Sequence, residues 1–259
     1  MKKTKNDSAL PSEDRENEVL LYIKQRGSAS IAEMAAEFSV SDMTIRRVLY
    51  KLADRGAAIR TPGGAMVAPS GSMERSFLER SAKMASAKER IGHEAAQLVH
   101  DGETIILDSG TTTRYIARHL GAKRDLTVIT TSLAVLEELA GSPSVSVRLT
   151  GGIYRRGSHD LAGPSVIDAL AGIFADKVFF GAAALSFKRG IMNYDAEMPK
   201  LFLRCAREKI LVIDSSKIGT EATYRLCGIE GCSLIVTDNK IRAADAARLR
   251  RSVTLMIAQ

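Results

Sequence analysis

Hydrophobic side chains at the start of the chain recur with the spacing of short helices. In the segment 13–26 they fall on one side, and Gly27 behind it suits the end of a helix. Ser30 and Glu33 have the spacing of a capping box, in which each side chain accepts a hydrogen bond from the other residue's backbone amide. The pattern therefore predicts one helix up to Arg26 and a second that starts directly after Ser30.

A third helix is expected soon after the second, which should end near Phe38. Ser41 closes a turn of three residues and is a favourable N-cap, while the negative charge of Asp42 suits a helix N-terminus. The third helix is thus expected from Asp42 to Arg55, with one apolar side and one side that carries hydroxyl and basic groups. Two helices joined by so short a turn form a helix-turn-helix, which lays the second helix against the base edges of DNA.

A hairpin is expected after the third helix. The short apolar runs 58–60 and 65–67 flank Pro62, Gly63 and Gly64, which suit the centre of a tight turn. This predicts a winged helix-turn-helix, with an ordinary helical bundle plus a hairpin as the alternative. The residues expected to bind DNA lie at the N-cap and on the exposed side of the third helix, and in the hairpin: Ser41, Met43, Thr44, Arg46, Arg47, Lys51 and Arg60.

Further along the chain the pattern becomes alternating. Proline, glycine and serine are frequent in 69–87, which predicts a linker with room for a short helix. Beyond it, apolar runs alternate with amphipathic helical stretches, which favours a mostly parallel sheet covered by helices. The expected strands are 104–107, 126–129, 145–149, 178–180, 210–213 and 234–236. The expected fold class is α/β, with a winged helix-turn-helix domain over 13–68, the linker, and an α/β domain over 88–259.

Hydroxyl residues, glycines and one lysine follow these expected strands. The carboxyl ends of parallel strands meet at one edge of a sheet, where such folds bind ligands. A glycine–hydroxyl loop that opens a helix offers amide donors to an anion, and Lys217 would neutralise a dianion. Helix capping explains one such loop, but several at one edge predict a ligand site. Its candidate residues are Asp108, Ser109, Gly110, Thr111, Thr112, Thr113, Thr131, Gly151, Gly152 and Lys217, of which Thr111, Thr113 and Lys217 are assigned to a phosphate group.

Charge and composition narrow the possible functions. Lys and Arg outnumber Asp and Glu by 37 to 30, and the basic residues of the first domain concentrate in 42–68, which favours nucleic acid as a partner. The longest apolar run, 178–185, is too short for a membrane span, and polar residues stand where a secretion signal would be apolar. A cytoplasmic protein with no membrane partner is therefore expected. The three cysteines and four histidines show no metal-ligand spacing, so neither a metal nor a cofactor is expected.

The chemistry of the ligand site has two interpretations. The sequence lacks the Walker and Rossmann glycine motifs, so a small phosphorylated polyol fits better than a nucleotide. The carboxylates that could bind sugar hydroxyls, or act as acid and base in an isomerase, are Asp108, Asp195, Glu197 and Asp214. A sugar-phosphate isomerase or sugar kinase-like enzyme with an accessory DNA-binding unit is therefore the alternative to a regulator.

Several motifs resemble the DeoR family of bacterial transcription regulators over almost the whole chain. Residues 40–47 and 63–65 resemble the helix-turn-helix signature of the family, and residues 107–113, 150–152 and 214–217 resemble its effector domain. The positions that depart from the family pattern are Val48, Pro62 and Thr131. The resemblance implies a sensor domain similar to ribose-5-phosphate isomerase that binds sugar phosphates without catalysis. Gly181, in a further stretch of that domain, completes the candidate ligand residues.

The function implied by the resemblance is transcription regulation. We expect a sequence-specific repressor of a carbohydrate-metabolism operon, which binds double-stranded operator DNA and is controlled by a phosphorylated sugar. Because two-fold DNA sites call for two-fold proteins, a homodimer or homotetramer is expected. No residue is assigned a catalytic role.

Overall fold

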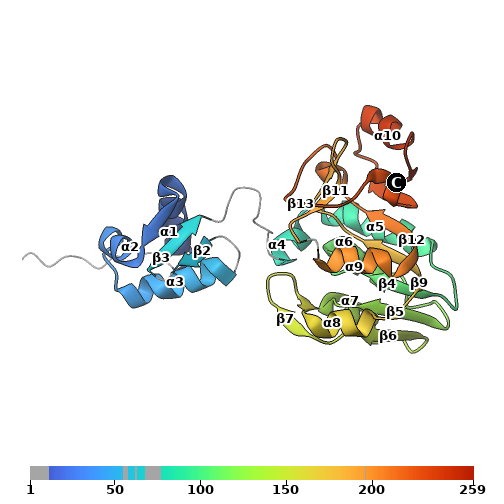
Figure 1. The fold of residues 1–259 in the computed structure, drawn as a ribbon, viewed down its shortest axis with the longest axis horizontal. Helices are drawn as coiled ribbons and strands as arrows, with labels where there is room; N and C mark the ends of the chain where they lie inside the picture. Colours follow the sequence, from blue (N-terminus) through green and yellow to red (C-terminus); the bar gives the residue numbers. More distant parts are fainter. Residues whose placement is uncertain (1–11, 55–57, 62, 68–76, 196) are drawn as a thin grey trace, which may run out of the picture. The chain divides into compact units, whose positions relative to one another are not determined.

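The computed structural model describes residues 12–54, 58–61, 63–67, 77–195 and 197–259 (Figure 1). The chain divides into two compact units, Met1–Arg75 and Ser76–Gln259. The first contains three helices and a small antiparallel sheet, and the second contains a parallel sheet with helices on both faces.

The first unit is a winged helix-turn-helix. Its elements are α1 (Ser12–Arg26), β1 (Ser28–Ser30), α2 (Ile31–Glu37), α3 (Asp42–Asp54), β2 (Ala58–Thr61) and β3 (Gly64–Val67). The three strands form an antiparallel sheet in the order β1-β3-β2. The three helices and the hairpin confirm the prediction, whereas β1 was not predicted because three residues are too few to show an alternating pattern. The predicted helix end at Arg55 and Gly56, and Pro62 in the turn, lie outside the described residues.

Side chains that cap the helices fix where α2 and α3 begin. The Glu33 amide donates to Ser30 Oγ at 3.1 Å, and the Ser30 amide donates to Glu33 Oε2 at 2.7 Å, which confirms the capping box. The Thr44 amide donates to Ser41 Oγ at 3.2 Å, so Ser41 caps α3 as predicted. The apolar sides of the three helices meet in one core, which includes Val19, Ile23, Met34, Ile45, Leu49 and Leu52.

One glycine of the hairpin is required by a close backbone approach. A Cβ added to Gly64 would lie 2.1 Å from the carbonyl oxygen of Ala29 and 2.7 Å from Ser30 Cα. Any side chain at this position would therefore push β3 away from β1. Gly63, directly before it, has nothing within 4 Å of the equivalent position.

The second unit is built on a sheet of seven parallel strands. Its order is β15-β14-β12-β9-β4-β5-β6, and every neighbouring pair is parallel. These strands are β4 (Thr104–Leu107), β5 (Leu126–Thr130), β6 (Val145–Leu149), β9 (Ala175–Phe180), β12 (Ala206–Val212), β14 (Leu234–Asp238) and β15 (Thr254–Ala258). Six of the seven confirm predicted strands, and β15 is the additional one.

Helices cover both faces of this sheet and make an α/β/α sandwich (Figure 1). One face packs against α5 (Ala85–Gln97), α6 (Thr111–Arg118) and α7 (Leu133–Leu139), and the other against α8 (Pro164–Leu170), α9 (Glu197–Arg204) and α10 (Ala243–Leu249). Successive strand residues alternate between the two cores: Phe179 belongs to the first, and Val178 and Phe180 belong to the second. The fold class is therefore the predicted α/β.

Two smaller sheets complete the second unit and were not predicted. An antiparallel hairpin pairs β7 (Ile153–Arg155) with β8 (Asp160–Ala162). A three-stranded sheet has the order β10-β11-β13, with β10 (Ala184–Ser186), β11 (Gly190–Asn193) and β13 (Tyr224–Cys227). All five strands are four residues or shorter, which leaves too little length for a periodic pattern to show.

The segment expected as a linker is partly helical. Residues 69–76 of it lie outside the described residues, but α4 (Phe77–Ala82) and the start of α5 belong to the second unit. Phe77 is buried, its amide donates to the carbonyl oxygen of Gly157 at 2.8 Å, and its ring lies 5.4 Å from the His159 ring. Folded structure therefore starts by Phe77 rather than at residue 88, because one aromatic side chain anchors a helix in a segment of otherwise loop-like composition.

Candidate functional site

The exposed side of α3 is the candidate DNA-binding surface of the first unit. Arg46 and Arg47 are exposed, as is Met43 at 68%, whereas the opposite side of the helix is buried in the core. Thr44 Oγ1 lies 3.0 Å from Ser41 Oγ, so these two hydroxyls share a hydrogen bond at the start of the helix. The structure thus places Ser41, Met43, Thr44, Arg46 and Arg47 at or near the exposed N-terminal half of α3, as the helix-turn-helix interpretation requires.

Two other residues, Lys51 and Arg60, were also predicted to bind DNA. Lys51 donates to Glu16 Oε1 at 2.7 Å, and Glu16 on α1 is only 1% exposed. This ion pair ties α1 to α3, so the geometry gives Lys51 a structural role that its position on the polar side of the helix did not indicate. The backbone of Arg60 lies in β2, and its side chain is outside the described part of the chain.

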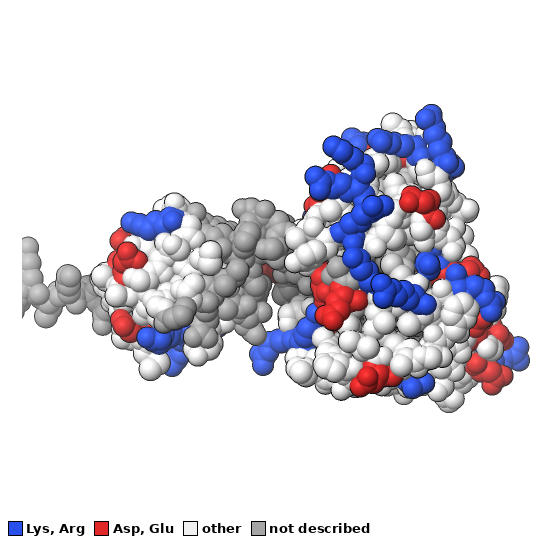
Figure 2. Space-filling model, in the orientation of Figure 1, with Lys and Arg blue, Asp and Glu red and all other residues white. Residues whose placement is uncertain are grey.

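Basic side chains are not confined to the first unit. Figure 2 shows Lys and Arg gathered over the region of β11, β13 and α10 on the second unit. The net charge of +7 is therefore spread over both units, and the charge alone does not locate the DNA-binding surface. The helix-turn-helix geometry of the first unit carries that assignment.

In the second unit, the connection between strands reverses direction at β4 and β9. The chain runs from β4 outward through β5 to β6, and then returns to β9 on the other side of β4. Ligands of open parallel sheets bind in the crevice outside the strand ends at such a reversal. The segments that leave β4 and β9 here are 108–110 and 181–183, which include the predicted residues Asp108, Ser109, Gly110 and Gly181.

Asp108 links the two loops that leave β4 and β9. Its Oδ1 accepts a hydrogen bond from the Ser109 amide at 2.7 Å, and its Oδ2 accepts one from the Gly181 amide at 3.3 Å. The side chain is buried, and burial raises its pKa to about 6 even though the two amides favour the charged form. The nearby charge of Asp160 raises this pKa further, while that of Arg80 lowers it.

The three threonines that open α6 are buried. Thr113 is 0% exposed, and its hydroxyl donates to the carbonyl oxygens of Asp108 and Gly110, at 2.5 Å and 2.7 Å. The only hydroxyl proton of Thr113 therefore serves the loop that holds Asp108, and its assignment to a phosphate stays a prediction. Thr111 and Thr112 are also buried. The N-cap residue of α6 is Gly110, which has no side chain to accept a hydrogen bond from the first amides of the helix.

Lys217 lies at the same edge of the sheet. Its Nζ donates to the carbonyl oxygen of Ala182 at 2.8 Å and lies 3.8 Å from Asp214 Oδ2. Burial lowers the pKa of Lys217, Asp214 opposes this shift, and the positive charges of Arg80 and Lys83 add to it. The structure thus brings Lys217 to the loop after β9 that also holds Gly181.

Lys88 and Arg80 belong to the same cluster, although the sequence did not single them out. Lys88 on α5 is only 2% exposed, and its Nζ donates to the carbonyl oxygens of Arg80 and, at 2.6 Å, of Lys83 at the end of α4. Burial and the neighbouring charge of Lys217 lower the pKa of Lys88 to about 8, against the effect of Asp214. We refer to Arg80, Lys83, Lys88 and Lys217 as the cation cluster.

The remaining candidate ligand residues lie further along the edge. Thr131 is buried behind β5, and its carbonyl oxygen accepts a hydrogen bond from the Leu161 amide at 2.9 Å. Gly151 and Gly152 follow β6, which is two strands from β4 and hence about 10 Å away across the sheet. The structure brings Asp108–Gly110, Gly181 and Lys217 together. It places Thr131, Gly151 and Gly152 at the margin of this group.

Of the candidate carboxylates, Asp195 is held in other contacts and Glu197 is exposed. Arg155 binds Asp160 through two hydrogen bonds of 2.9 Å and 2.7 Å, and binds Asp195 through a third of 2.7 Å. Asp195 also accepts the Glu197 amide at 3.0 Å, and Glu197 is exposed at the start of α9. Neither side chain is arranged as an acid or a base beside Asp108.

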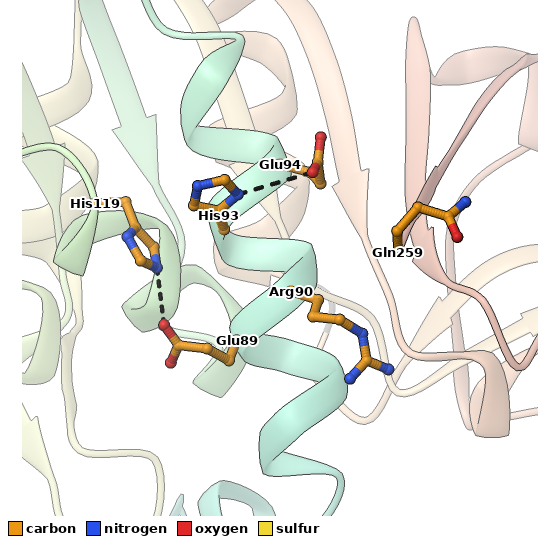
Figure 3. Close-up of a pocket in the computed structure, with 6 residues that line it drawn as sticks. All are labelled: Glu89, Arg90, His93, Glu94, His119 and Gln259. Carbon is orange, nitrogen blue, oxygen red and sulfur yellow. Dashed lines mark hydrogen bonds and ion pairs between the residues drawn. The ribbon is translucent and has the colours of Figure 1, made fainter.

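A separate hollow of about 230 Å³ lies at α5, α6 and the C-terminus (Figure 3). It is lined by Glu89, Arg90, His93, Glu94, His119 and Gln259. His119 Nε2 lies 2.8 Å from Glu89 Oε1, and His93 Nδ1 lies 3.8 Å from Glu94 Oε1. Among the described residues, no group of three or more His, Cys, Asp or Glu side chains could hold a metal ion, this hollow included. Every described helix also falls short of the length and apolarity that a membrane crossing needs.

The fold and the site define a two-part regulator, in which a helix-turn-helix unit is followed by a ligand-sensing α/β unit. Residues 15–70 match the model of the DeoR-like helix-turn-helix domain, and residues 83–239 match that of the DeoR C terminal sensor domain. The chain therefore belongs to the DeoR family of transcriptional regulators.

Named relatives agree with this assignment over nearly the whole chain. The HTH-type transcriptional regulator GolR of Listeria innocua is 32% identical over 234 residues, which cover 89% of this chain and 92% of that protein. The HTH-type transcriptional repressor GlcR of Bacillus subtilis is 31% identical over 251 residues, which cover 95% and 96%. Because these relatives are regulators, the protein is a regulator and the isomerase-like enzyme is not favoured.

The second unit is also similar to a solved ribose 5-phosphate isomerase from Plasmodium falciparum. The TM-score is 0.37 at 16% sequence identity, and the match covers 52% of this chain and 53% of the isomerase.

Proposed function

We propose that this protein is a repressor that binds a two-fold operator through α3 and the hairpin, and changes its DNA affinity when a phosphorylated sugar binds at the carboxyl end of the second unit's sheet. The observation that carries this proposal is the cation cluster, which gathers beside Asp108 and Gly181 where the strand order reverses.

The cation cluster favours an anionic ligand. Burial lowers the pKa of both Lys88 and Lys217, the charges of Arg80 and Lys83 lower both further, and the charge of Lys217 also lowers that of Lys88. Asp214 is the neighbouring carboxylate that offsets part of this repulsion. A phosphate dianion placed among these groups would offset the rest, and the first amides of α6 would supply further hydrogen-bond donors.

The neighbouring groups suit the sugar part of such a ligand. Asp108 offers carboxylate oxygens beside the Gly181 amide, and both lie at the reversal point close to the cluster. Sugar hydroxyls can donate to the carboxylate and accept from backbone amides, so one ligand can satisfy both parts of the crevice. A phosphorylated sugar or sugar derivative therefore fits this site better than inorganic phosphate.

The first helix of the sensor unit gives the ligand a route to the DNA-binding unit. α4 directly follows the segment that joins the two units, and its carbonyl oxygens accept the Lys88 ammonium. A ligand that draws Lys88 or Arg80 toward itself would change how α4 is held. Only a ligand that favours one arrangement over the other can shift DNA affinity, and this shared contact supplies such a difference.

We further infer that the active form is a homodimer or homotetramer. A helix-turn-helix reads one half-site, and two half-sites one helical turn apart need two copies related by a two-fold axis.

The proposal is tested by thermal shift with a panel of phosphorylated sugars, the same sugars without phosphate, and inorganic phosphate. A ligand present at about 100 times its Kd should add about 2.7 kcal/mol to the free energy of unfolding of a domain that binds it only when folded. The best ligand is then titrated into a complex with operator DNA obtained by in vitro selection. Stabilisation without release of DNA would contradict the repressor function, and conversion of the sugar phosphate to product would favour an enzyme.

A further inference from the structure

Cys227 and Cys232 face each other across one tight turn. Cys227 ends β13, and the 3-10 turn η2 (Ile229–Gly231) separates it from Cys232. The turn closes with two hydrogen bonds of 3.1 Å, from the Gly231 amide to the Gly228 carbonyl and from the Cys232 amide to the Ile229 carbonyl. The chain therefore reverses direction between the two cysteines.

This turn brings the backbone before Cys232 against the Cys227 side chain. A Cβ added to Gly231, the residue before Cys232, would lie 3.2 Å from Cys227 Cβ and 3.4 Å from its sulfur. The thiol of Cys232 forms a hydrogen bond with that of Cys227. Gly231 has no side chain that would crowd the Cys227 sulfur.

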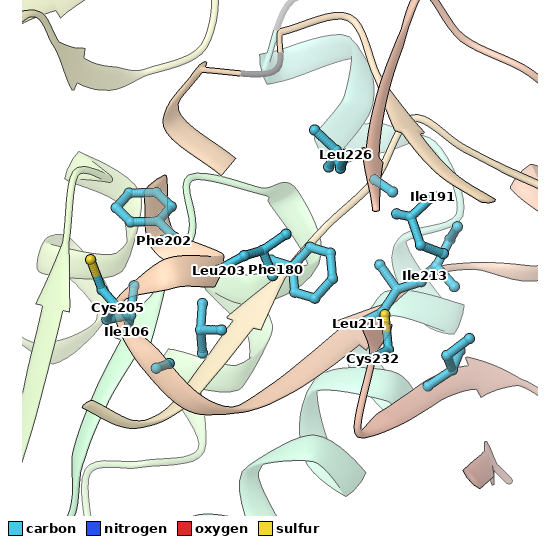
Figure 4. Packing of buried hydrophobic residues seen from close by; sticks show 14 of the residues in the cluster. Ile106, Phe180, Ile191, Phe202, Leu203, Cys205, Leu211, Ile213, Leu226 and Cys232 are labelled. Atoms are coloured by element: carbon cyan, nitrogen blue, oxygen red, sulfur yellow. The ribbon is translucent and has the colours of Figure 1, made fainter. Parts of the chain in front are cut away.

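The two thiols have unequal surroundings. Cys227 is half-buried, so a small solute can reach it, whereas Cys232 is 6% exposed and belongs to the core cluster that includes Leu211 and Ile213 (Figure 4). The hydrogen bond from Cys232 lowers the pKa of Cys227, and the charges of Lys209 and Arg225 act in the same direction, while burial and the charge of Glu230 oppose the shift. The pKa of Cys232 is raised by the same hydrogen bond and by burial. A half-buried thiol with a lowered pKa next to a more deeply buried partner is the arrangement of an attacking and a resolving cysteine.

We propose that Cys227 and Cys232 are a peroxide-reactive pair that closes to a disulfide. The Cys227 thiolate attacks the O–O bond of a hydroperoxide, which forms a sulfenic acid on Cys227 and releases water or an alcohol. The sulfur of Cys232 then attacks the sulfenic sulfur, the S–O bond breaks, and the hydroxide leaves as water with the proton of Cys232. The two thiols lose two electrons, and the peroxide gains them.

The disulfide would fasten the small sheet to the large one. β13 pairs with β11, and Cys232 lies shortly before β14 of the parallel sheet. A closed pair would prevent the end of β13 from moving relative to β14. The proposal concerns thiol chemistry alone and requires neither DNA nor a sugar ligand.

The test uses the reduced full-length protein, a slight excess of hydrogen peroxide, intact mass and peptide mapping. We expect wild type to lose two hydrogen atoms and to yield a peptide that links Cys227 to Cys232, with reversal by dithiothreitol. Cys205→Ser is the matched control, because Cys205 is a buried thiol whose hydrogen bond goes to a backbone carbonyl rather than to sulfur. This variant should form the same disulfide.

The single variants of the pair separate the two roles. Cys232→Ser should stop at a sulfenic acid on Cys227, which dimedone traps, and Cys227→Ser should form neither product. Circular dichroism checks that each variant is folded. The proposal is overturned if wild type accumulates sulfenic acid on Cys227 without closing the disulfide, if wild type shows no reaction at either thiol, or if Cys232 in Cys227→Ser is oxidised as fast as Cys227 in wild type.

Discussion

Asp108 Oδ2 accepts the Gly181 amide at 3.3 Å, and this contact joins the carboxyl ends of β4 and β9, which are distant in sequence and adjacent in the sheet. The same side chain has a pKa of about 6, raised by burial. The residue that joins these two strand ends is therefore also one whose charge changes close to neutral pH.

Asp108 should make stability depend on pH. Its pKa is about 3.8 unfolded and about 6 folded, so between these values the folded state binds more protons than the unfolded state. The free energy of unfolding should therefore fall as pH rises from about 4 to 6, by up to about 3 kcal/mol. Denaturant unfolding of wild type and Asp108→Asn across this range checks it. If Asp108 does not contribute, the difference in the free energy of unfolding between wild type and Asp108→Asn should not change with pH.

Lys217→Met should abolish the response to ligand and leave operator binding intact in its absence. The change removes a positive charge from the cation cluster while keeping a side chain of similar length. Coupling of about 1–3 kcal/mol would correspond to a 5- to 150-fold change in DNA affinity in wild type, and to none in the variant. Operator titrations with and without the identified sugar phosphate measure this.

Lys123→Met is the control for that experiment. Lys123 also donates from Nζ to a backbone carbonyl, that of Val99 at 2.6 Å, but before β5 and so at the amino ends of the strands. The Lys123→Met variant should respond to ligand as wild type does. An unchanged midpoint and amplitude in Lys217→Met would show that Lys217 does not hold the phosphate.

Ligand affinity should decline as pH rises through about 8. Lys88 has a pKa of about 8 because it is buried near Lys217, and an anion binds the protonated form better. Binding of the phosphorylated ligand should therefore take up a proton above this pH. Isothermal titration calorimetry in buffers of different ionisation enthalpy measures the uptake, which Lys88→Met should lose. Equal proton uptake in both proteins would assign the titration to another group.

Arg47→Ala should reduce the preference for operator over random DNA. Arg47 is exposed on the N-terminal half of α3, where a helix-turn-helix reads base edges. A bidentate contact with guanine would be worth about 1–3 kcal/mol. Arg60→Ala, in the hairpin, should instead weaken all sequences alike. Gel shifts at one salt concentration compare the variants, and operator affinity unchanged by Arg47→Ala would argue against α3 as the recognition helix.

Gly64→Ala should destabilise the first unit. The added methyl group would meet the backbone of β1 at 2.1 Å, and neither strand can yield without losing the pairing between them. We expect a loss of about 3 kcal/mol or more. Gly63→Ala, with nothing within 4 Å, is the neighbouring control and should change the free energy of unfolding far less. Equal thermal unfolding of the two variants would contradict the close approach.

Local signals predicted most of the fold. The capping box at Ser30 and the N-cap at Ser41 act within four residues, so the helix starts can be read directly from the sequence. The longer apolar strands show as runs of buried residues. β15 and the five short strands depend on tertiary pairing, which no local pattern encodes.

The site was predicted in part for the same reason. Asp108 and Lys217 follow strands, and the rule that parallel strands end at one edge brings them together, whereas Gly181 was expected only from the resemblance to the DeoR family. Lys88 lies within a helix and would ordinarily be solvated; its burial follows from α4, whose packing rests on Phe77. Thr113 has the right residue type and place, but the sequence does not show that its hydroxyl donates to the loop carbonyls.

The Lys88 contact with α4 also bears on how such regulators could diversify. α4 folds with the sensor, and the chain ahead of Ser76 belongs to the other unit, so the boundary lies just outside the helix that meets the ligand site. A different DNA reader attached at this junction would inherit the ligand dependence without altering one residue of the crevice. A change of target promoter and a change of inducer would then be independent evolutionary steps, because the residues for each lie on different sides of α4 in the sequence.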